Sequence, residues 1–161
     1  MANLRCFYQN TRGLRSKVQD IFHNVISNNH DVICLTETWL NSGVLSSEVF
    51  PDDYVVFRRD RESSGSLKKD GGGVLLAVKD AYEASRCQEL ECDAEDLWIS
   101  ITNSVGSKIY ICCVYIPPGD NNAFASFVNN LYTLENIFSE RAVVMVGDFN
   151  LPAVRWINTK N

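Results

Sequence analysis

An apolar run followed directly by a polar tetrapeptide constrains the fold of this chain more than any other feature. Residues 142–146 (AVVMV) have the length and composition of a strand buried on both faces of a sheet. Residues 147–150 (GDFN) follow, so a carboxylate and a carboxamide stand where that strand leaves the core. Ligand sites of open α/β sheets lie at the carboxyl ends of strands. The run therefore predicts a central strand with a site at its end, although an Asx turn, in which Asp148 and Asn150 bond only nearby backbone, fits these residues equally well.

Hydrophobic periodicity predicts further strands and two amphipathic helices elsewhere in the chain. Strands are expected at 4–8, 31–36, 54–57 and 74–78, a hairpin at 96–116, and helices at 14–28 and 122–139. The stretch from 79 to 93 is only weakly patterned. With about seven strands and two long helices, the chain is predicted to be one α/β domain, a sandwich of two sheets with helices packed outside them.

Polar side chains recur where the apolar strands end. They are Asn10, Glu37, Tyr115, Asp148 and Asn150. A carboxylate with an amide oxygen suits a hard cation such as Mg²⁺, so Glu37 and Asn10 are candidate metal ligands. Asp148 is suited to orient or deprotonate a water, Asn150 to donate to a phosphoryl oxygen, and Tyr115 to donate to developing negative charge. Together these groups indicate metal-assisted hydrolysis of a phosphodiester.

The charge distribution gives a weaker indication of a nucleic-acid partner. A net charge of −5 argues against nonspecific binding to a polyanion, but it does not exclude a site that cleaves phosphate esters. Basic residues gather near the start, where Arg12 and Arg15 are candidate contacts to a nucleic-acid backbone, and again around residues 58–69. Such runs are more often solvated loops, and contact with phosphate is the alternative for both groups.

Glycine and cysteine patterns exclude two further kinds of site. The triplet at 71–73 lacks the Gly-Lys-Ser/Thr ending of a phosphate loop and precedes a strand, so close backbone packing or a bulge is expected there. The six cysteines form no Cys-x-x-Cys pair, which argues against zinc and for reduced, buried thiols. No apolar run has transmembrane length and the start lacks a signal peptide, so we expect a protein of the nucleus or cytoplasm that is not secreted and has no membrane partner.

Five motifs occur in the order of one known family. They are residues 9–14 (QNTRGL), 35–40 (LTETWL), 71–74 (GGGV), 114–118 (VYIPP) and 147–152 (GDFNLP). In these the chain resembles the endonuclease/exonuclease/phosphatase superfamily. Within it, the chain is most similar to the apurinic-type endonuclease domain that begins the polyprotein of non-LTR (LINE-type) retrotransposons. The TETWL and DFNLP segments, with Trp156 following, are similar to jockey-like elements.

The resemblance implies a four-layer α/β sandwich and an enzyme that nicks DNA with Mg²⁺, or Mn²⁺ as an alternative, and without a small-molecule cofactor. The nick leaves a 3′-hydroxyl that primes reverse transcription by a following reverse transcriptase domain. By position in the motifs, Asn10 and Glu37 hold the metal and Tyr115 contacts the scissile phosphate. Asp148 then handles the attacking water, and Asn150 supports the transition state.

One departure from the family pattern concerns its late Ser-Asp-His element, which has no counterpart here. The two histidines, His23 and His30, both precede Glu37. Residues 1–161 are therefore expected to be the N-terminal part of the domain, without its C-terminal strands and with weak or no activity alone. A non-catalytic remnant or interaction module is the main alternative. A phosphatase or phospholipase of the same superfamily is a third.

Overall fold

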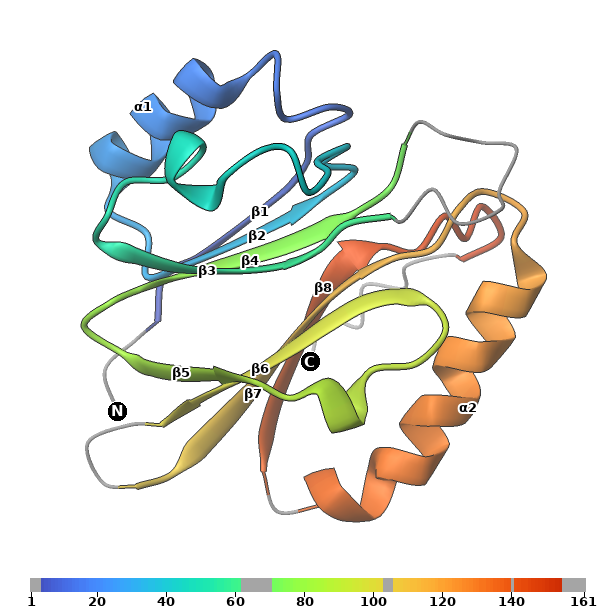
Figure 1. Ribbon diagram of the computed structural model, residues 1–161. Helices are drawn as coiled ribbons and strands as arrows, with labels where there is room; N and C mark the ends of the chain where they lie inside the picture. The colour runs from blue at the N-terminus through green and yellow to red at the C-terminus, as the bar shows by residue number, and fades with distance from the viewer. Residues whose placement is uncertain (1–3, 62–70, 103–105, 140, 155–161) are drawn as a thin grey trace, which may run out of the picture.

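The computed structural model describes residues 4–61, 71–102, 106–139 and 141–154, which form two packed four-stranded sheets (Figure 1). The first sheet has the order β1-β2-β4-β3 and the second has the order β5-β6-β7-β8. The strands of the first sheet are β1 (Cys6–Asn10), β2 (Val32–Thr36), β3 (Tyr54–Arg59) and β4 (Val74–Lys79). Those of the second are β5 (Glu83–Arg86), β6 (Glu95–Thr102), β7 (Lys108–Tyr115) and β8 (Ala142–Asp148).

Both sheets are mixed, because each contains one parallel pair joined through a helix. Helix α1 (Val18–Asn28) connects the parallel strands β1 and β2, and helix α2 (Asn121–Phe138) connects the parallel strands β7 and β8. The other neighbours, β2 with β4, β3 with β4, β5 with β6 and β6 with β7, are antiparallel. Short 3₁₀ turns at Ser46–Glu48 and Gln88–Leu90 complete the regular elements.

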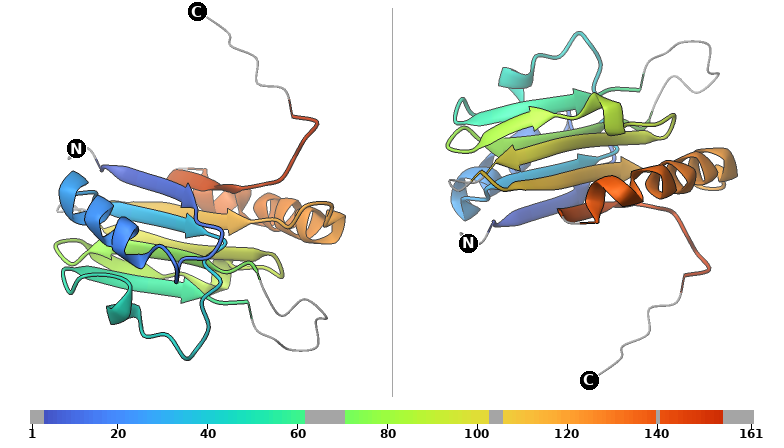
Figure 2. Two further views of the ribbon diagram at one scale, coloured as in Figure 1. Left: turned by 90° about the horizontal axis from the view of Figure 1, so that it is seen from above. Right: turned by 90° about the horizontal axis from the view of Figure 1, so that it is seen from below.

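Alternation along the strands divides the core into three apolar layers. Val32 and Cys34 of β2 face the second sheet, where they join a cluster with Leu97 and Ile99 of β6. The intervening residues of β2 point the other way, toward α1. On the far side, Phe127 of α2 packs on the outer face of the second sheet. Each sheet thus carries one helix on its outer face, which gives the predicted four-layer α/β sandwich (Figure 2).

Three local expectations need correction. The first helix begins at Val18 rather than at residue 14, because the backbone of Leu14 is still bonded to the segment after β2 (Leu14 N to Thr38 O, 2.9 Å). The weakly patterned stretch contains β5, an edge strand whose side chains alternate between exposed and half-buried. The apolar run at 142–146 is not a central strand, because in the described part of the chain β8 pairs only with β7 and lies at the edge of its sheet.

The thiols are mostly buried, as the sequence predicts. All six cysteines are free, and Cys34, Cys112 and Cys113 are buried in the sheets, where burial raises the pKa of each thiol. Cys6 is the exception, since it is exposed on the edge strand β1. Among the described residues, neither helix is long and apolar enough to span a membrane.

Candidate active site

The carboxyl ends of β1, β2, β7 and β8 lie at one edge of the sandwich. Within the first sheet Asn10 is paired in register with Thr36, so the chain leaves β1 and β2 at the same level. Within the second sheet Tyr115 is paired with Asp148 at the ends of β7 and β8. The two parallel pairs therefore present their terminal polar residues together, as expected for a ligand site of an α/β fold.

A hydrogen bond between the two sheets joins the first and last of these residues. The Asn10 side-chain amide (Nδ2) donates to Asp148 Oδ2 at 2.7 Å, across 138 positions of sequence. The other Asp148 oxygen, Oδ1, accepts the backbone N–H of Asn150 at 3.2 Å. Both carboxylate oxygens of Asp148 therefore accept a hydrogen bond. The predicted convergence of Asn10 with Asp148 is observed.

Glu37 and Tyr115 form a second contact between the sheets. The Glu37 carboxylate lies close enough to the Tyr115 hydroxyl to raise its pKa. It also accepts the indole N–H of Trp39 at 2.6 Å. Trp39 had no role in the sequence interpretation, although it lies within the LTETWL motif. Its ring also covers Gly13, where a Cβ would come within 2.9 Å of the ring atom Cε3. Trp39 therefore connects the loop after β1 with the carboxylate after β2.

The environment of Tyr115 favours its protonated form. Burial raises the pKa of the Tyr115 hydroxyl, and the nearby Glu37 carboxylate raises it further. The nearby Arg61 guanidinium, 5.8 Å from the ring centroid, acts in the opposite direction and lowers the pKa by a smaller amount. Tyr115 therefore remains a hydrogen-bond donor at neutral pH, which is the role that the sequence predicts for it.

The backbone around this edge is strained. Arg12, Glu37, Trp39 and Asn150 all have left-handed backbone conformations, with φ between 45° and 55°. Such conformations cost of order 1 kcal/mol or more for residues with a Cβ and gather at functional sites. Thr38 lies between two of them, and of the described buried side chains its hydroxyl oxygen is the one without a hydrogen-bond partner. The strained residues and the unpaired Thr38 hydroxyl therefore lie at the same edge of the sandwich as the polar cluster.

The three other candidate residues lie beside the cluster, and their side chains do not bond Asp148 or Glu37 in the described structure. They are Asn150, Arg12 and Arg15. The Asn150 side-chain amide donates to the Ile116 carbonyl at 2.9 Å, which joins the loops that follow β7 and β8. The Arg12 backbone N–H donates to Asn10 Oδ1 at 3.2 Å, and the side chains of Arg12 and Arg15 are exposed in the loop after β1. Both arginines are accessible to a ligand beside the site.

The glycine triplet has the packing role that the sequence predicts. Gly71, Gly72 and Gly73 all have φ between 69° and 107°. A Cβ on Gly73 would lie 2.6 Å from Thr38 Oγ1, and one on Gly72 would overlap the Arg61 guanidinium. Without side chains, the triplet can pair its backbone with the segment after β2 (Trp39 N to Gly72 O, 3.0 Å). It therefore supports the backbone of the Glu37 loop.

The oxygen donors at this edge fit a hard divalent cation. Asn10, Glu37 and Asp148 offer one amide oxygen and two carboxylates, the donor types that Mg²⁺ prefers. No group of three or more His, Cys, Asp or Glu side chains suited to a metal occurs among the described residues. A site with few protein ligands is compatible with Mg²⁺, which usually keeps several of its waters, and less so with zinc.

Neither histidine belongs to the cluster. His30 precedes β2, whereas Glu37 follows it, so the two lie at opposite ends of that strand. The His30 ring stacks on Phe7, with 5.1 Å between ring centroids. His23 is exposed on α1. The candidate site therefore consists of carboxylate, amide and phenol groups.

Comparisons with known proteins agree with this geometry. The sequence profile of the endonuclease/exonuclease/phosphatase family matches residues 2–159. No curated protein sequence matches the chain.

Several solved structures share the fold at low sequence identity. The endonuclease domain of TRAS1, a telomere-specific non-LTR retrotransposon, superposes with a TM-score of 0.68 at 14% identity, covering 93% of this chain and 62% of that one. The AP endonuclease LMAP from Leishmania major gives 0.69 at 16% identity, covering 92% and 55%. TDP2 from D. rerio, complexed with a single-strand DNA product, gives 0.60 at 17% identity, covering 94% and 62%. The chain thus spans less than two thirds of the length of each of these three structures.

Proposed function

Because the chain belongs to the endonuclease/exonuclease/phosphatase family, we propose that it is a metal-dependent phosphodiesterase domain that nicks DNA. The observation that carries the proposal is the hydrogen bond from Asn10 to Asp148, which brings the polar ends of the two sheets into one cluster. The Glu37–Tyr115 contact places an acidic group and a protonated phenol in the same cluster. Such a set combines metal ligands, a base and a donor to phosphate.

Each residue has a distinct part in the proposed reaction. Glu37 and the Asn10 side-chain oxygen would hold Mg²⁺, which when bound neutralises negative charge on the phosphate. Asp148 accepts a proton from the attacking water, whose oxygen forms a bond to phosphorus while the bond from phosphorus to the 3′ oxygen breaks. The leaving 3′ oxygen takes up a proton from solvent and becomes the 3′-hydroxyl. Tyr115 donates a hydrogen bond to a phosphate oxygen, and the Asn10 amide keeps the Asp148 carboxylate oriented.

The finer assignment is that residues 1–161 belong to the endonuclease domain of a non-LTR retrotransposon. The five ordered motifs, including residues 35–40 and 147–152, support it, and the similarity in fold to the TRAS1 endonuclease domain is consistent with it. In this proposal the nick supplies a 3′-hydroxyl to a reverse transcriptase domain of the same polyprotein, in the nucleus or cytoplasm. Arg12 and Arg15 would contact the DNA backbone beside the site.

Nicking of a supercoiled plasmid in the presence of Mg²⁺ tests the proposal. Glu37→Gln keeps an oxygen that can accept from the Trp39 indole but removes the charge, and Asp148→Asn removes the base. We expect either change to lower the nicking rate by about 10²–10⁴-fold, as is typical when a positioned catalytic group is lost. Chelation of the metal should abolish nicking in all variants.

Glu135→Gln is a matched control, because it neutralises an exposed carboxylate on α2. It should nick at the rate of the parent chain. Nicking that is insensitive to Glu37→Gln and Asp148→Asn would contradict the proposed site. If the folded parent shows no nicking above the two variants, the chain is instead a non-catalytic remnant or interaction module.

A further inference from the structure

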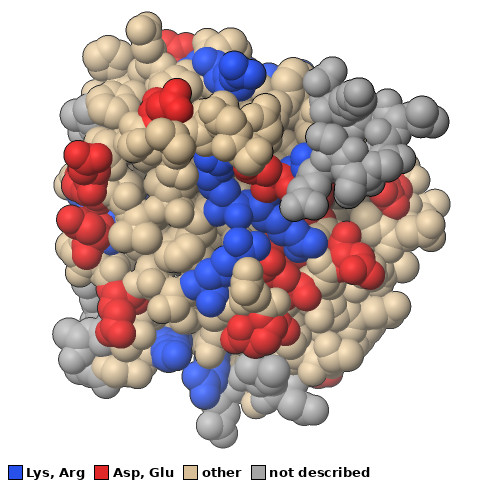
Figure 3. All heavy atoms as spheres, viewed as in Figure 1, with Lys and Arg blue, Asp and Glu red and all other residues tan. Residues whose placement is uncertain are grey.

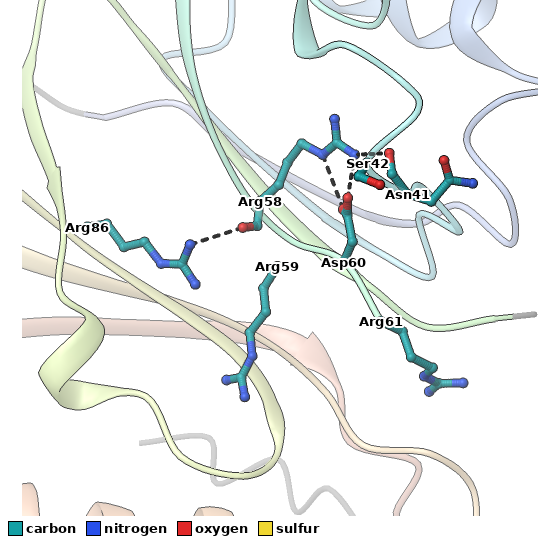
Figure 4. Close-up of a pocket in the computed structure, with 7 residues that line it drawn as sticks. All are labelled: Asn41, Ser42, Arg58, Arg59, Asp60, Arg61 and Arg86. Atoms are coloured by element: carbon teal, nitrogen blue, oxygen red, sulfur yellow. Dashed lines mark hydrogen bonds and ion pairs between the residues drawn. The ribbon is translucent and has the colours of Figure 1, made fainter. Parts of the chain in front are cut away.

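A polar cavity lies between β3 and β5, the edge strands of the two sheets. It has a volume of about 500 Å³ and is lined by Arg58, Arg59, Arg61 and Arg86, with Asp60, Asn41 and Ser42 completing its wall (Figure 4). We call these residues the arginine pocket. Four guanidinium groups around one cavity are unusual in a chain whose net charge is −5.

Each of the four arginines has a carboxylate partner. Asp60, the partner of Arg58, lines the pocket itself and is 21% exposed, whereas the partners of Arg59 and Arg86 lie deeper than the arginines. The Arg59 side chain is 30% exposed, whereas its partner Asp96 is fully buried, with 2.8 Å between Nη1 and Oδ1. Arg86 is 27% exposed and its partner Glu91 is 10% exposed. At Arg59 and Arg86 the guanidinium is therefore more exposed than its carboxylate, and Figure 3 shows a patch of Lys and Arg side chains in the middle of this face with Asp and Glu side chains beside it.

Hydrogen bonds hold the guanidinium groups in place without exhausting their donors. Arg86 Nη1 donates to the Arg58 carbonyl at 3.1 Å, and Arg58 donates to the carbonyls of Val44 and Asn41. The hydrogen bonds that the described residues make with Arg59 occupy three of its five N–H groups. Arginines that are already ordered lose little side-chain entropy when they bind a phosphate.

The arginine pocket shares a wall with the candidate active site. Arg61 lines the pocket, and its guanidinium also stands over the Tyr115 ring, 5.8 Å from the centroid. Glu95 pairs with Arg61 and accepts the Gly73 backbone N–H at 2.6 Å, so the same network supports the glycine triplet. A ligand strand that reaches Tyr115 can therefore continue along this edge of the sandwich into the pocket.

We propose that the arginine pocket binds the phosphodiester backbone of the nucleic-acid strand whose bond is cut, at phosphates beyond the scissile one. The inference rests on the proposed function, since it assigns to the same substrate a further contact, away from the bond that is cut. Planar guanidinium groups with fixed orientation match the oxygen geometry of phosphate. These contacts carry no base specificity, so they position the strand and do not select its sequence.

Two substitutions change the charge of the pocket without touching its arginines. Asn41 Oδ1 accepts the Gly43 N–H at 2.9 Å, and the carboxylate of Asn41→Asp can accept the same bond while placing a negative charge at the rim. Ser42→Lys adds a positive charge at an exposed neighbouring position. Asn129→Asp, at an exposed position on α2, is the control for the same chemical change elsewhere.

The measurement is the Kd of a fluorescein-labelled DNA duplex of mixed sequence, in EDTA so that no cleavage occurs, over a series of salt concentrations. We expect Asn41→Asp to raise Kd by about fivefold at low salt, and Ser42→Lys to lower it by a similar factor. The slope of log K against log salt should become shallower by about 0.9 in the first variant and steeper by about 0.9 in the second. Asn129→Asp should match the parent.

Two outcomes would overturn the inference. One is a parent chain that does not bind the duplex, and the other is a Kd and salt slope that are the same in Asn41→Asp, Ser42→Lys and Asn129→Asp. If nicking still depends on Glu37 in the second case, the proposed function stands and the pocket is a structural link between β3 and β5. Binding that depends on the pocket in a chain that does not nick would instead retain the pocket and contradict the proposed function.

Discussion

β2 and β8 are both short, apolar and uncharged up to the end of the strand, but they are buried to very different extents. All five residues of β2 are buried, with β1 and β4 on either side. In β8, Val144 is 39% and Met145 is 46% exposed, and within the described chain β7 is its only neighbour in the sheet. Apolar composition therefore shows that a strand is suited to burial. The neighbours that the strand has in the fold decide whether it is buried.

The sharpest test of this difference is the same substitution in both strands. Val32→Asp places a carboxylate between the two sheets, where Val32 is fully buried, and we expect it to lower the free energy of unfolding by more than about 4 kcal/mol. Val144→Asp should change it by less than about 0.5 kcal/mol, because the side chain already reaches solvent. Urea denaturation measures both. Equal losses would show that β8 is covered in solution.

The side of β8 that faces β7 should also be sensitive to substitution, although less so than the core. A Cβ on Gly147 would overlap the Val114 carbonyl oxygen and lie 2.8 Å from its Cγ1. We expect Gly147→Ala to cost about 1–3 kcal/mol of unfolding free energy, because the strands must separate. Since Asp148 follows directly, nicking should fall by more than the loss of folded protein explains. Thermal melting and plasmid nicking on one sample separate the two effects.

The open side of β8 should cause self-association. An apolar edge strand whose charged residue stands only at its end is a template for pairing with another strand. We expect the parent chain to form concentration-dependent oligomers, and Met145→Lys to reduce them while changing the free energy of unfolding by less than about 0.5 kcal/mol. Sedimentation velocity over a range of concentrations is the measurement. A monomeric parent would contradict the prediction.

The smallest expected effect concerns β1, the edge strand of the other sheet. Burial raises the pKa of Tyr8 from 10.0 to about 12, against a smaller lowering by its hydrogen bond to Thr36. Because the folded state holds this proton more tightly, the stability it provides is complete below pH 10 and is lost as the pH rises toward 12. Tyr8→Phe should flatten the fall in unfolding free energy over this range.

The sequence predicted the elements and the family because both depend on local patterns. Strand periodicity located β2 and β4, and helical spacing located α2 to within one residue at each end. The residues paired in the cluster, Asn10 with Asp148, were identified because polar groups at strand ends are visible without coordinates. The sandwich itself followed from the order of the elements.

What could not be predicted depends on contacts between distant segments. That β8 is an edge strand follows from which neighbour pairs with it, and no local pattern contains this information. Arg59 and Arg61 were interpreted mainly as part of a solvated loop, because their partners, the buried Asp96 and the half-buried Glu95, are more than thirty positions away. Trp39 was overlooked for a related reason, since an exposed indole has a role only once Gly13 and Glu37 are known to surround it.

The hydrogen bond between Asn10 and Asp148 also has a consequence for the order of folding. Its partners are separated by 138 residues, and they belong to different sheets. The site cannot form on a growing polypeptide until residue 148 has been synthesised and the two sheets have docked. The polar cluster would therefore be assembled late, only after both sheets have formed and packed together.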